Sequence, residues 1–167
     1  EKINRHTDFL TNLISELLDI ARIESGRVGM TIRPVELPHL LEGVVDLLGP
    51  QIKEKNLNVD IRTPAKLPAV EADENQIQRV FTNLLSNAIR FTPENGTISI
   101  RAVPTDALLN VEVSDTGIGM PPEDLSMLFT EFFRADNPIN RERKGTGLGL
   151  VLVKRIIEAH GGHIGVR

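Results

Sequence analysis

The run from Asp73 to Pro93 constrains the fold more than any other stretch of the sequence. Its apolar residues recur at helical spacing, at Ile77, Val80, Phe81, Leu84, Leu85, Ala88 and Ile89. This spacing predicts an amphipathic helix with one buried face, and Asp73 suits its N-cap. Asn83 and Asn87 lie one turn apart and Arg90 follows, so the predicted helix carries a polar stripe beside its buried face.

The segments before this helix predict one long helix, two strands and a second helix. Residues 3–24 carry an apolar stripe wider than one small domain needs. This favours a helical bundle, with packing on the chain's own domain as the alternative. Residues 28–36 alternate like a strand, Pro38 opens a helix that runs to about residue 55, and residues 57–61 form a short strand. A loop is expected from there to the central helix.

After the central helix, residues 97–103 and 107–114 alternate in polarity and are joined by a short loop, which predicts a β-hairpin. Pro121 and Pro122 begin a short helix. Helices and a mainly antiparallel sheet in this order indicate a two-layer α/β sandwich.

The C-terminal part of the chain combines a polar segment with a third helix. Residues 133–144 are rich in basic and other polar residues without an apolar period, so we expect a mobile loop. Residues 147–159 predict a helix, and residues 163–167 begin a strand.

Composition excludes several classes of function. The net charge of −4 and the lack of a basic cluster argue against a nucleic-acid partner. The chain has no cysteine, and its four histidines are scattered, so neither a disulfide framework nor a zinc site is expected. No apolar run approaches the roughly 20 residues that span a bilayer, and no signal peptide is visible.

Two glycine-rich stretches follow the central helix, Asp115-Thr-Gly-Ile-Gly-Met120 and Gly145-Thr-Gly-Leu-Gly-Leu150. In the first, a carboxylate could accept a hydrogen bond from the exocyclic amine of adenine, although Asp-x-Gly also ends many strands in a simple turn. In the second, flexible backbone amides precede a helix and would form an anion cradle suited to a triphosphate. The spacing fits neither a dinucleotide-binding fingerprint nor a phosphate loop with Gly-Lys-Ser/Thr.

These three stretches, in this order, resemble the N, G1 and G2 boxes of the sensor histidine kinases of two-component signalling, members of the GHKL superfamily of ATPases and kinases. Residues 16–26 resemble the end of the second dimerisation helix of that family, and residues 128–134 resemble its F box. The resemblance implies an α/β (α+β) fold, a two-layer sandwich of the GHKL (Bergerat) type. Three helices would lie on a mixed, mainly antiparallel sheet, preceded by one long bundle helix. It also implies two parts, residues 1–26 from the dimerisation domain and residues 27–167 as an ATP-binding catalytic domain without its last strand.

The resemblance implies ATP and Mg²⁺ as ligands and gives roles to single residues. Asn87 would be the oxygen ligand of Mg²⁺, and Asn83 would hold a water or a phosphate oxygen. Asn83 and Arg90 are the expected catalytic residues, Phe91 would flank the adenine, and Asp115 would accept from its amine. The implied nucleotide-binding set is Asn83, Asn87, Arg90, Phe91, Asp115, Gly117, Gly119, Gly145, Thr146, Gly147, Leu148 and Gly149.

Two of these positions depart from common patterns of the superfamily. Asn83 stands where its hydrolases carry a glutamate that acts as general base. An amide cannot take that proton, so Asn83 favours transfer to another nucleophile over hydrolysis. Arg90 stands where the family usually has Lys, which keeps the charge but changes the geometry of donation. From the residues alone, a solvated helix-end arginine is an equal alternative.

The region after the first glycine stretch is expected to supply a lid. Phe129, Phe132 and Phe133 are predicted core anchors at its base. A positive face on the lid would come from Arg134, Arg141, Arg143 and Lys144, with solvated loop charge as the alternative.

The resemblance therefore implies a protein histidine kinase domain that passes the γ-phosphoryl group of ATP to a histidine, for relay to an aspartate of a response regulator. None of the four histidines fits the phosphoacceptor motif, so we expect that residue on a preceding dimerisation helix and no autophosphorylation by this chain alone. The expected partners are that helix, a second copy of the protein and a receiver domain. We expect a cytoplasmic domain, whose parent protein could carry a membrane anchor. A GHKL ATPase, an anti-sigma-type serine kinase and a binding module without catalysis are the alternatives.

Overall fold

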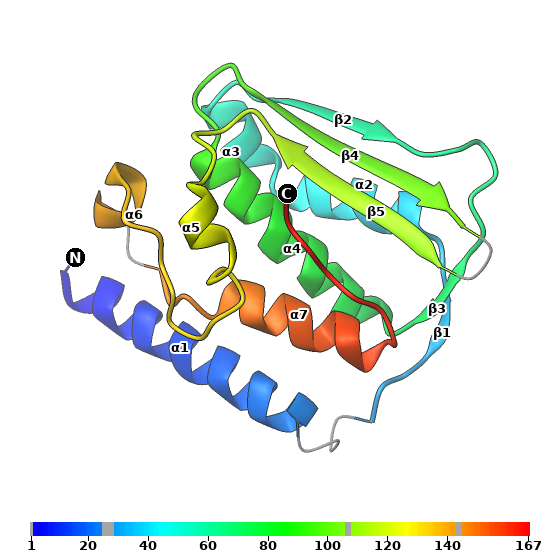
Figure 1. Ribbon diagram of the computed structural model, residues 1–167, viewed down its shortest axis with the longest axis horizontal. Coiled ribbons are helices and arrows are strands. Elements are labelled where there is room, and N and C mark those ends of the chain that lie inside the picture. The colour runs from blue at the N-terminus through cyan, green and yellow to red at the C-terminus, as the bar shows by residue number, and fades with distance from the viewer. Residues whose placement is uncertain (1, 25–28, 106–107, 143–144) are drawn as a thin grey trace. The chain divides into compact units, whose positions relative to one another are not determined.

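The computed structural model describes residues 2–24, 29–105, 108–142 and 145–167, and the chain forms two compact units (Figure 1). Residues 30–119 make up the first, here called the sheet unit. Residues 1–29 and 120–167 make up the second, here called the helical unit.

The sheet unit is built on three paired strands, β2 (Asn58–Arg62), β4 (Thr97–Pro104) and β5 (Leu109–Asp115), in the order β2-β4-β5. β2 runs parallel to β4, and β5 runs antiparallel to it, which confirms the predicted hairpin and gives a mixed sheet. Alternation along β4 leaves only one face of the sheet buried. The buried residues of β4 are Ile98, Ile100 and Ala102.

Helices α2 (Leu37–Leu47) and α4 (Glu74–Phe91) pack against this buried face (Figure 1). α4 is the predicted central helix, and its buried residues are Val80, Phe81, Leu85, Ala88 and Ile89. Its N-cap is also as predicted, because one Asp73 carboxylate oxygen accepts from the Gln76 amide at 3.1 Å. The other oxygen accepts from the Thr31 amide at 2.9 Å, which ties the helix start to the preceding chain.

The predicted helix from Pro38 to residue 55 is interrupted. Its first part, α2, ends at Leu47 with Leu48 as the C-cap, and α3 (Gly49–Glu54) follows as a separate short helix. Pro50 explains the break, because its ring lacks an N–H and clashes with the carbonyl four residues earlier.

A second, two-stranded sheet pairs β1 (Arg33–Val35) with β3 (Val70–Ala72) antiparallel. β1 is shorter than the predicted strand 28–36, of which residue 28 lies outside the described residues. β3 was predicted as loop, and the prediction was wrong because three residues are too few to show an alternating pattern.

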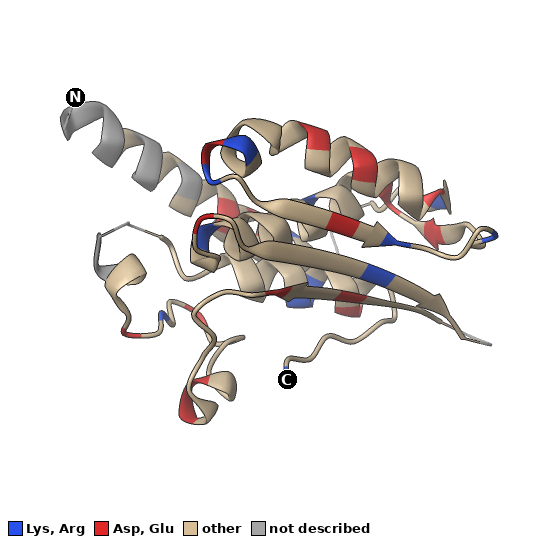
Figure 2. Cartoon of the chain, turned by 90° about the horizontal axis from the view of Figure 1, so that it is seen from above, with Lys and Arg blue, Asp and Glu red and all other residues tan. Residues whose placement is uncertain are grey.

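Charged residues occur along the helices and strands of the sheet unit (Figure 2). On the edge strand β2, Arg62 pairs with Asp60 at 2.6 Å. On α2, the exposed Glu42 and Asp46 stand one turn apart. A charged edge strand disfavours pairing with a further strand from another molecule.

In the helical unit, α1 (Lys2–Glu24) and α7 (Gly149–Ala159) lie side by side (Figure 1). Both helices were predicted, although α7 starts two residues later than expected because Gly147 has a left-handed φ of +73°. The remaining helices are short, α5 (Pro122–Leu125) and α6 (Pro138–Glu142).

Two predictions for the helical unit need correction. The expected loop 133–144 contains α6 within its described part. Residues 163–167 form no strand, because no described segment pairs with them and a strand needs a neighbour for its hydrogen bonds. Among the described helices, none is both long enough and apolar enough to cross a membrane.

Candidate functional site

The polar stripe of α4 is formed by half-buried amides. The Asn83 side-chain nitrogen donates to the carbonyl oxygen of Arg79 at 3.0 Å, so the helix itself engages the donor end of this amide. Asn87 lies one turn later on the same helix face. The burial of the opposite face fixes the direction of both amides.

The C-terminal end of α4 is organised by a residue that the sequence-based prediction missed. Lys55 donates through its ammonium group to three carbonyl oxygens, those of Ile89 at 2.7 Å, Arg90 at 3.0 Å and Thr92 at 2.7 Å. Beside this cap, the Arg90 guanidinium lies 5.3 Å from the centre of the Phe91 ring, within range of a cation–π interaction. No local pattern could reveal Lys55, because at least 34 residues separate it from its acceptors.

The loop after β5 approaches the end of α4 closely. The Gly117 amide donates to a carboxylate oxygen of Asp115 at 2.9 Å, so the Asp-x-Gly turn considered from the sequence is formed. The Ile118 amide donates to the Phe91 carbonyl oxygen at 3.3 Å and joins this loop to the helix end. Gly119 has a φ of +66°, which favours glycine.

Gly117 has no room for a side chain. A Cβ there would lie 2.4 Å from the Asp115 carboxylate and 2.8 Å from the Phe91 carbonyl oxygen. The sheet unit therefore brings together the residues predicted in the first two boxes through one close backbone approach.

The second glycine-rich stretch belongs to the helical unit and forms a tight turn before α7. The Leu148 amide donates to the Thr146 hydroxyl oxygen at 3.3 Å, and the Thr146 hydroxyl donates to the carboxylate of Glu16 in α1. Leu148 is fully buried, and α7 begins at Gly149. Glu16 was also missed from the sequence, because 130 residues separate it from Thr146.

Phe132 is not the core anchor that the sequence suggested. Its side chain is 55% exposed and its φ is +62°, whereas Phe129 and Phe133 are half-buried. The backbone of Phe132, and not its ring, makes the tight contact. A Cβ on Gly147 would lie 2.8 Å from the Phe132 Cα.

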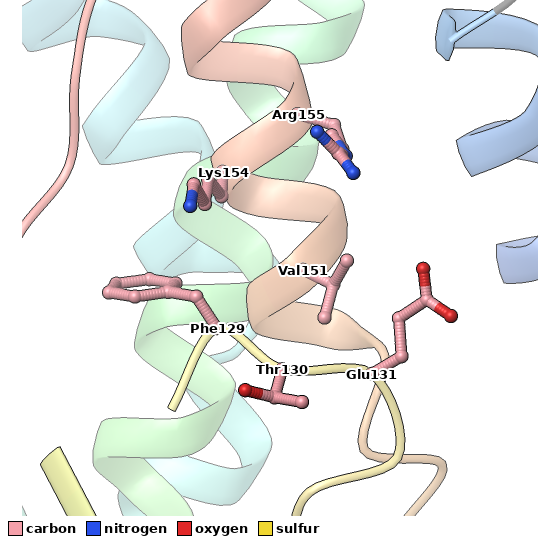
Figure 3. A pocket seen from close by; sticks show the side chains of 6 residues that line it. All are labelled: Phe129, Thr130, Glu131, Val151, Lys154 and Arg155. Atoms are coloured by element: carbon pink, nitrogen blue, oxygen red, sulfur yellow. The ribbon is translucent and has the colours of Figure 1, made fainter. Parts of the chain in front are cut away.

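An open hollow of about 400 Å³ lies between the F-box turn and α7 (Figure 3). The Lys154 ammonium faces the Phe129 ring at 5.9 Å, and Lys154 and Arg155 both reach Glu158, at 3.8 and 3.7 Å. None of the predicted nucleotide-binding residues lines this hollow. Its lining is Phe129, Thr130, Glu131, Val151, Lys154 and Arg155.

The predicted positive face of the lid is described only in part. Arg134 donates to the carbonyl oxygen of Asn140, which ties it to α6. Arg143 and Lys144 lie outside the described residues, as does the side chain of Arg141.

A Mg²⁺ ion would have few protein ligands here. Among the described residues, no group of three or more His, Cys, Asp or Glu side chains could hold a metal. The amide oxygen of Asn87 fits the way in which Mg²⁺ is bound with nucleotides, through one or two protein oxygens together with phosphates and water.

Two glycines with the same backbone conformation allow a matched test of the turn before α7. Gly147 (φ +73°) faces the Phe132 backbone, whereas Gly161 (φ +74°) has open space where a Cβ would be. We predict that Gly161→Ala costs about 1 kcal/mol for the left-handed conformation alone and that Gly147→Ala costs more than about 2 kcal/mol. Urea unfolding of both variants measures the difference, and equal losses would contradict the close contact.

The chain is similar to known proteins of one family. Residues 72–167, which include α4 and both glycine-rich stretches, match the family model described as "Histidine kinase-, DNA gyrase B-, and HSP90-like ATPase". Sensor protein GacS of Pseudomonas syringae pv. syringae is 41% identical over 170 residues, which cover 98% of this chain and 19% of GacS. The circadian input-output histidine kinase CikA of Synechococcus elongatus is 36% identical over 159 residues, 94% of this chain and 21% of CikA. The chain thus spans about a fifth of the length of these curated relatives.

Solved structures give the same result for the fold. Full-length ShkA in complex with AMPPNP matches with a TM-score of 0.84 and 30% identity, over 96% of this chain and 33% of ShkA. The catalytic domain of the histidine kinase ThkA matches with a TM-score of 0.68 and 33% identity, over 77% of this chain and 82% of that domain. The predicted GHKL-type α/β fold is therefore confirmed, and the chain belongs to the family of histidine kinase-, DNA gyrase B- and HSP90-like ATPases.

Proposed function

We propose that this chain is the Mg²⁺–ATP-binding catalytic domain of a sensor histidine kinase. The observation that carries the proposal is the junction in the sheet unit, where the Phe91 carbonyl oxygen accepts from the Ile118 amide. It joins the amide stripe of α4 to the Asp115 loop within the region that matches the ATPase family.

The adenine end of the nucleotide would be bound at this junction. The exposed Asp115 carboxylate would accept a hydrogen bond from the exocyclic amine, through an oxygen outside its turn with Gly117. Gly117 and Gly119 leave the backbone accessible to the base, and the half-buried Phe91 would flank it.

The phosphate end would be bound by amides, a cation and the second glycine-rich stretch. Asn87 would give its amide oxygen to Mg²⁺, which supplies charge neutralisation between the phosphates when bound. Asn83 would hold a water or a phosphate oxygen, and Arg90 would neutralise phosphate charge as the second catalytic residue. Gly145, Thr146, Gly147, Leu148 and Gly149 would cradle the phosphates before the N-terminus of α7.

The reaction would be transfer of the γ-phosphoryl group. The bond between the γ-phosphorus and the β–γ bridging oxygen breaks, a bond from phosphorus to a histidine nitrogen forms, and ADP leaves. Asn83 supports transfer over hydrolysis, because its amide cannot take a proton from water and its nitrogen already donates to Arg79. The chain would act by positioning and charge neutralisation.

The histidine would come from a preceding dimerisation helix in a homodimer, and an aspartate of a response regulator would receive the phosphoryl group afterwards. Residues 1–26 would then belong to the second dimerisation helix and residues 27–167 to the catalytic domain. An exposed apolar stripe on α1 supports this division, because such a stripe is typical of a bundle helix. It consists of Leu10, Ile14, Leu17 and Leu18, which are 37–55% exposed. A domain with these substrates is expected to work in the cytoplasm.

Asn87→Ala tests the nucleotide site. We predict a rise of more than tenfold in the dissociation constant of Mg²⁺–ATP, because the variant loses the proposed metal ligand. Isothermal titration calorimetry measures it, with Asn75→Ala, an exposed asparagine in the first turn of the same helix, as control. Equal affinity of Asn87→Ala and the unmodified protein would refute the assignment.

Glu16 tests the proposed link between α1 and the phosphate cradle. Its carboxylate accepts from the Thr146 hydroxyl and so sets a negative charge beside a loop that would hold a triphosphate. We predict that Glu16→Gln, which keeps an acceptor but removes the charge, raises ATP affinity about three- to tenfold. The control is Glu42→Gln, which removes one negative charge from the exposed face of α2 and should leave the ATP affinity unaltered. An unchanged or lower affinity in Glu16→Gln would contradict the electrostatic role.

A further inference from the structure

We infer that Lys55 is a positioning residue for the adenine end of the nucleotide site, acting through the backbone between Arg90 and Thr92. The inference rests on the proposed function for the identity of the ligand. Its structural part, that Lys55 sets the position of the Asp115 loop, can be measured without a nucleotide.

Lys55 supplies hydrogen-bond donors to carbonyl groups at the C-terminal end of α4. The last carbonyl groups of a helix have no partner within it and carry the negative end of the helix dipole. An ammonium group has three donors in a tetrahedral arrangement, and Lys55 directs them to three oxygens at 2.7–3.0 Å. The half-buried lysine therefore holds the end of α4 by a charged, three-way hydrogen bond.

Lys55 is itself fixed by its surroundings. Its carbonyl oxygen accepts from the Asn95 amide at 3.0 Å, in the turn that follows α4. Next to it, the Asn56 side chain donates to the Asn95 side chain at 2.7 Å, and the Asn58 amide donates to the Gly96 carbonyl oxygen at 2.9 Å. Lys55 thus contacts the chain before the turn at residues 93–96, through its side chain, and within that turn, through its carbonyl oxygen.

The carbonyl groups at the helix end alternate between two partners. Those of Arg90 and Thr92 accept from Lys55, and the one between them, on Phe91, accepts from the Ile118 amide. Because a Cβ on Gly117 would come within 2.8 Å of that same oxygen, the Asp115 loop has little freedom against this segment. A shift of the helix end would therefore break the hydrogen bond from Ile118 or carry the loop with it. In either case it would move Phe91 and Asp115, the two groups proposed to bind adenine.

Lys55→Met removes the donors and keeps the length of the side chain. We expect the dissociation constant of Mg²⁺–ADP, measured by calorimetry, to rise about tenfold, and hydrogen exchange of the Ile118 amide in the nucleotide-free protein to speed up about tenfold. For Lys55→Arg, we expect both the dissociation constant and the exchange rate to lie between those of the unmodified protein and of Lys55→Met, because arginine keeps the charge but donates in a plane. It also serves if the methionine variant does not fold. Lys53 is an exposed lysine of α3 two residues away. In Lys53→Met, the ADP dissociation constant and the Ile118 exchange rate should stay within twofold of those of the unmodified protein.

Exchange and affinity together show whether a negative result contradicts the role of Lys55 or the proposed nucleotide binding. If Lys55→Met exchanges faster only within the last turn of α4, with unchanged Ile118 exchange and unchanged ADP affinity, Lys55 is a helix cap and the inference is overturned. Unchanged ADP affinity with faster Ile118 exchange also overturns the role at the adenine end. If the unmodified protein and Lys53→Met do not bind ADP, the proposed function fails, while Ile118 exchange still decides whether Lys55 positions the loop.

Discussion

The sheet unit depends on the burial of one face of α4 in the core that it shares with α2 and the three-stranded sheet. Five residues of this helix are buried, and each large apolar side chain among them contributes about 1.5–3 kcal/mol. Turning the helix by one residue would rotate every side chain by about 100° and lose much of that contribution. The direction of Asn83 and Asn87 is therefore set by the core, so a small polar site can be oriented without many hydrogen bonds of its own.

Close backbone approaches then define both glycine-rich stretches. In the sheet unit, Gly117 lies against the Phe91 carbonyl group, and in the helical unit, Gly147 lies against the backbone of Phe132. In each case a side chain would occupy space that the neighbouring main chain already fills. The glycines thus allow both loops to stay compact against the neighbouring main chain.

Patterns within short stretches of the sequence predicted the helices and strands that depend on those stretches alone. The apolar period and N-cap of α4, the hairpin of β4 and β5, and the helices α1 and α7 were all visible in the sequence. The break at Leu48 had a signal in Pro50 that the apolar period concealed. β3 has only three residues and depends on its pairing with β1, so no period could reveal it.

The sequence pointed to candidate residues that stand within one motif, and it did not reveal those defined by contacts across the fold. Asn83, Asn87, Asp115 and the glycines stand in recognisable stretches. Lys55 and Glu16 do not, because each is defined by a contact with a distant segment of the chain. A lysine before a strand and a glutamate in a helix resemble ordinary surface residues until the contact is seen. Phe132 shows the reverse error, since an aromatic residue beside core residues was expected to be buried and its backbone conformation turns it outward.

Phosphoryl transfer to a histidine tests the central claim most directly. The chain would be incubated with Mg²⁺ and γ-labelled ATP together with a separate polypeptide that carries the parent protein's histidine-bearing dimerisation helices. We predict label on that polypeptide that is lost in acid and survives base, as expected of phosphohistidine. Release of free labelled phosphate without any labelled protein would contradict the claim and indicate an ATPase.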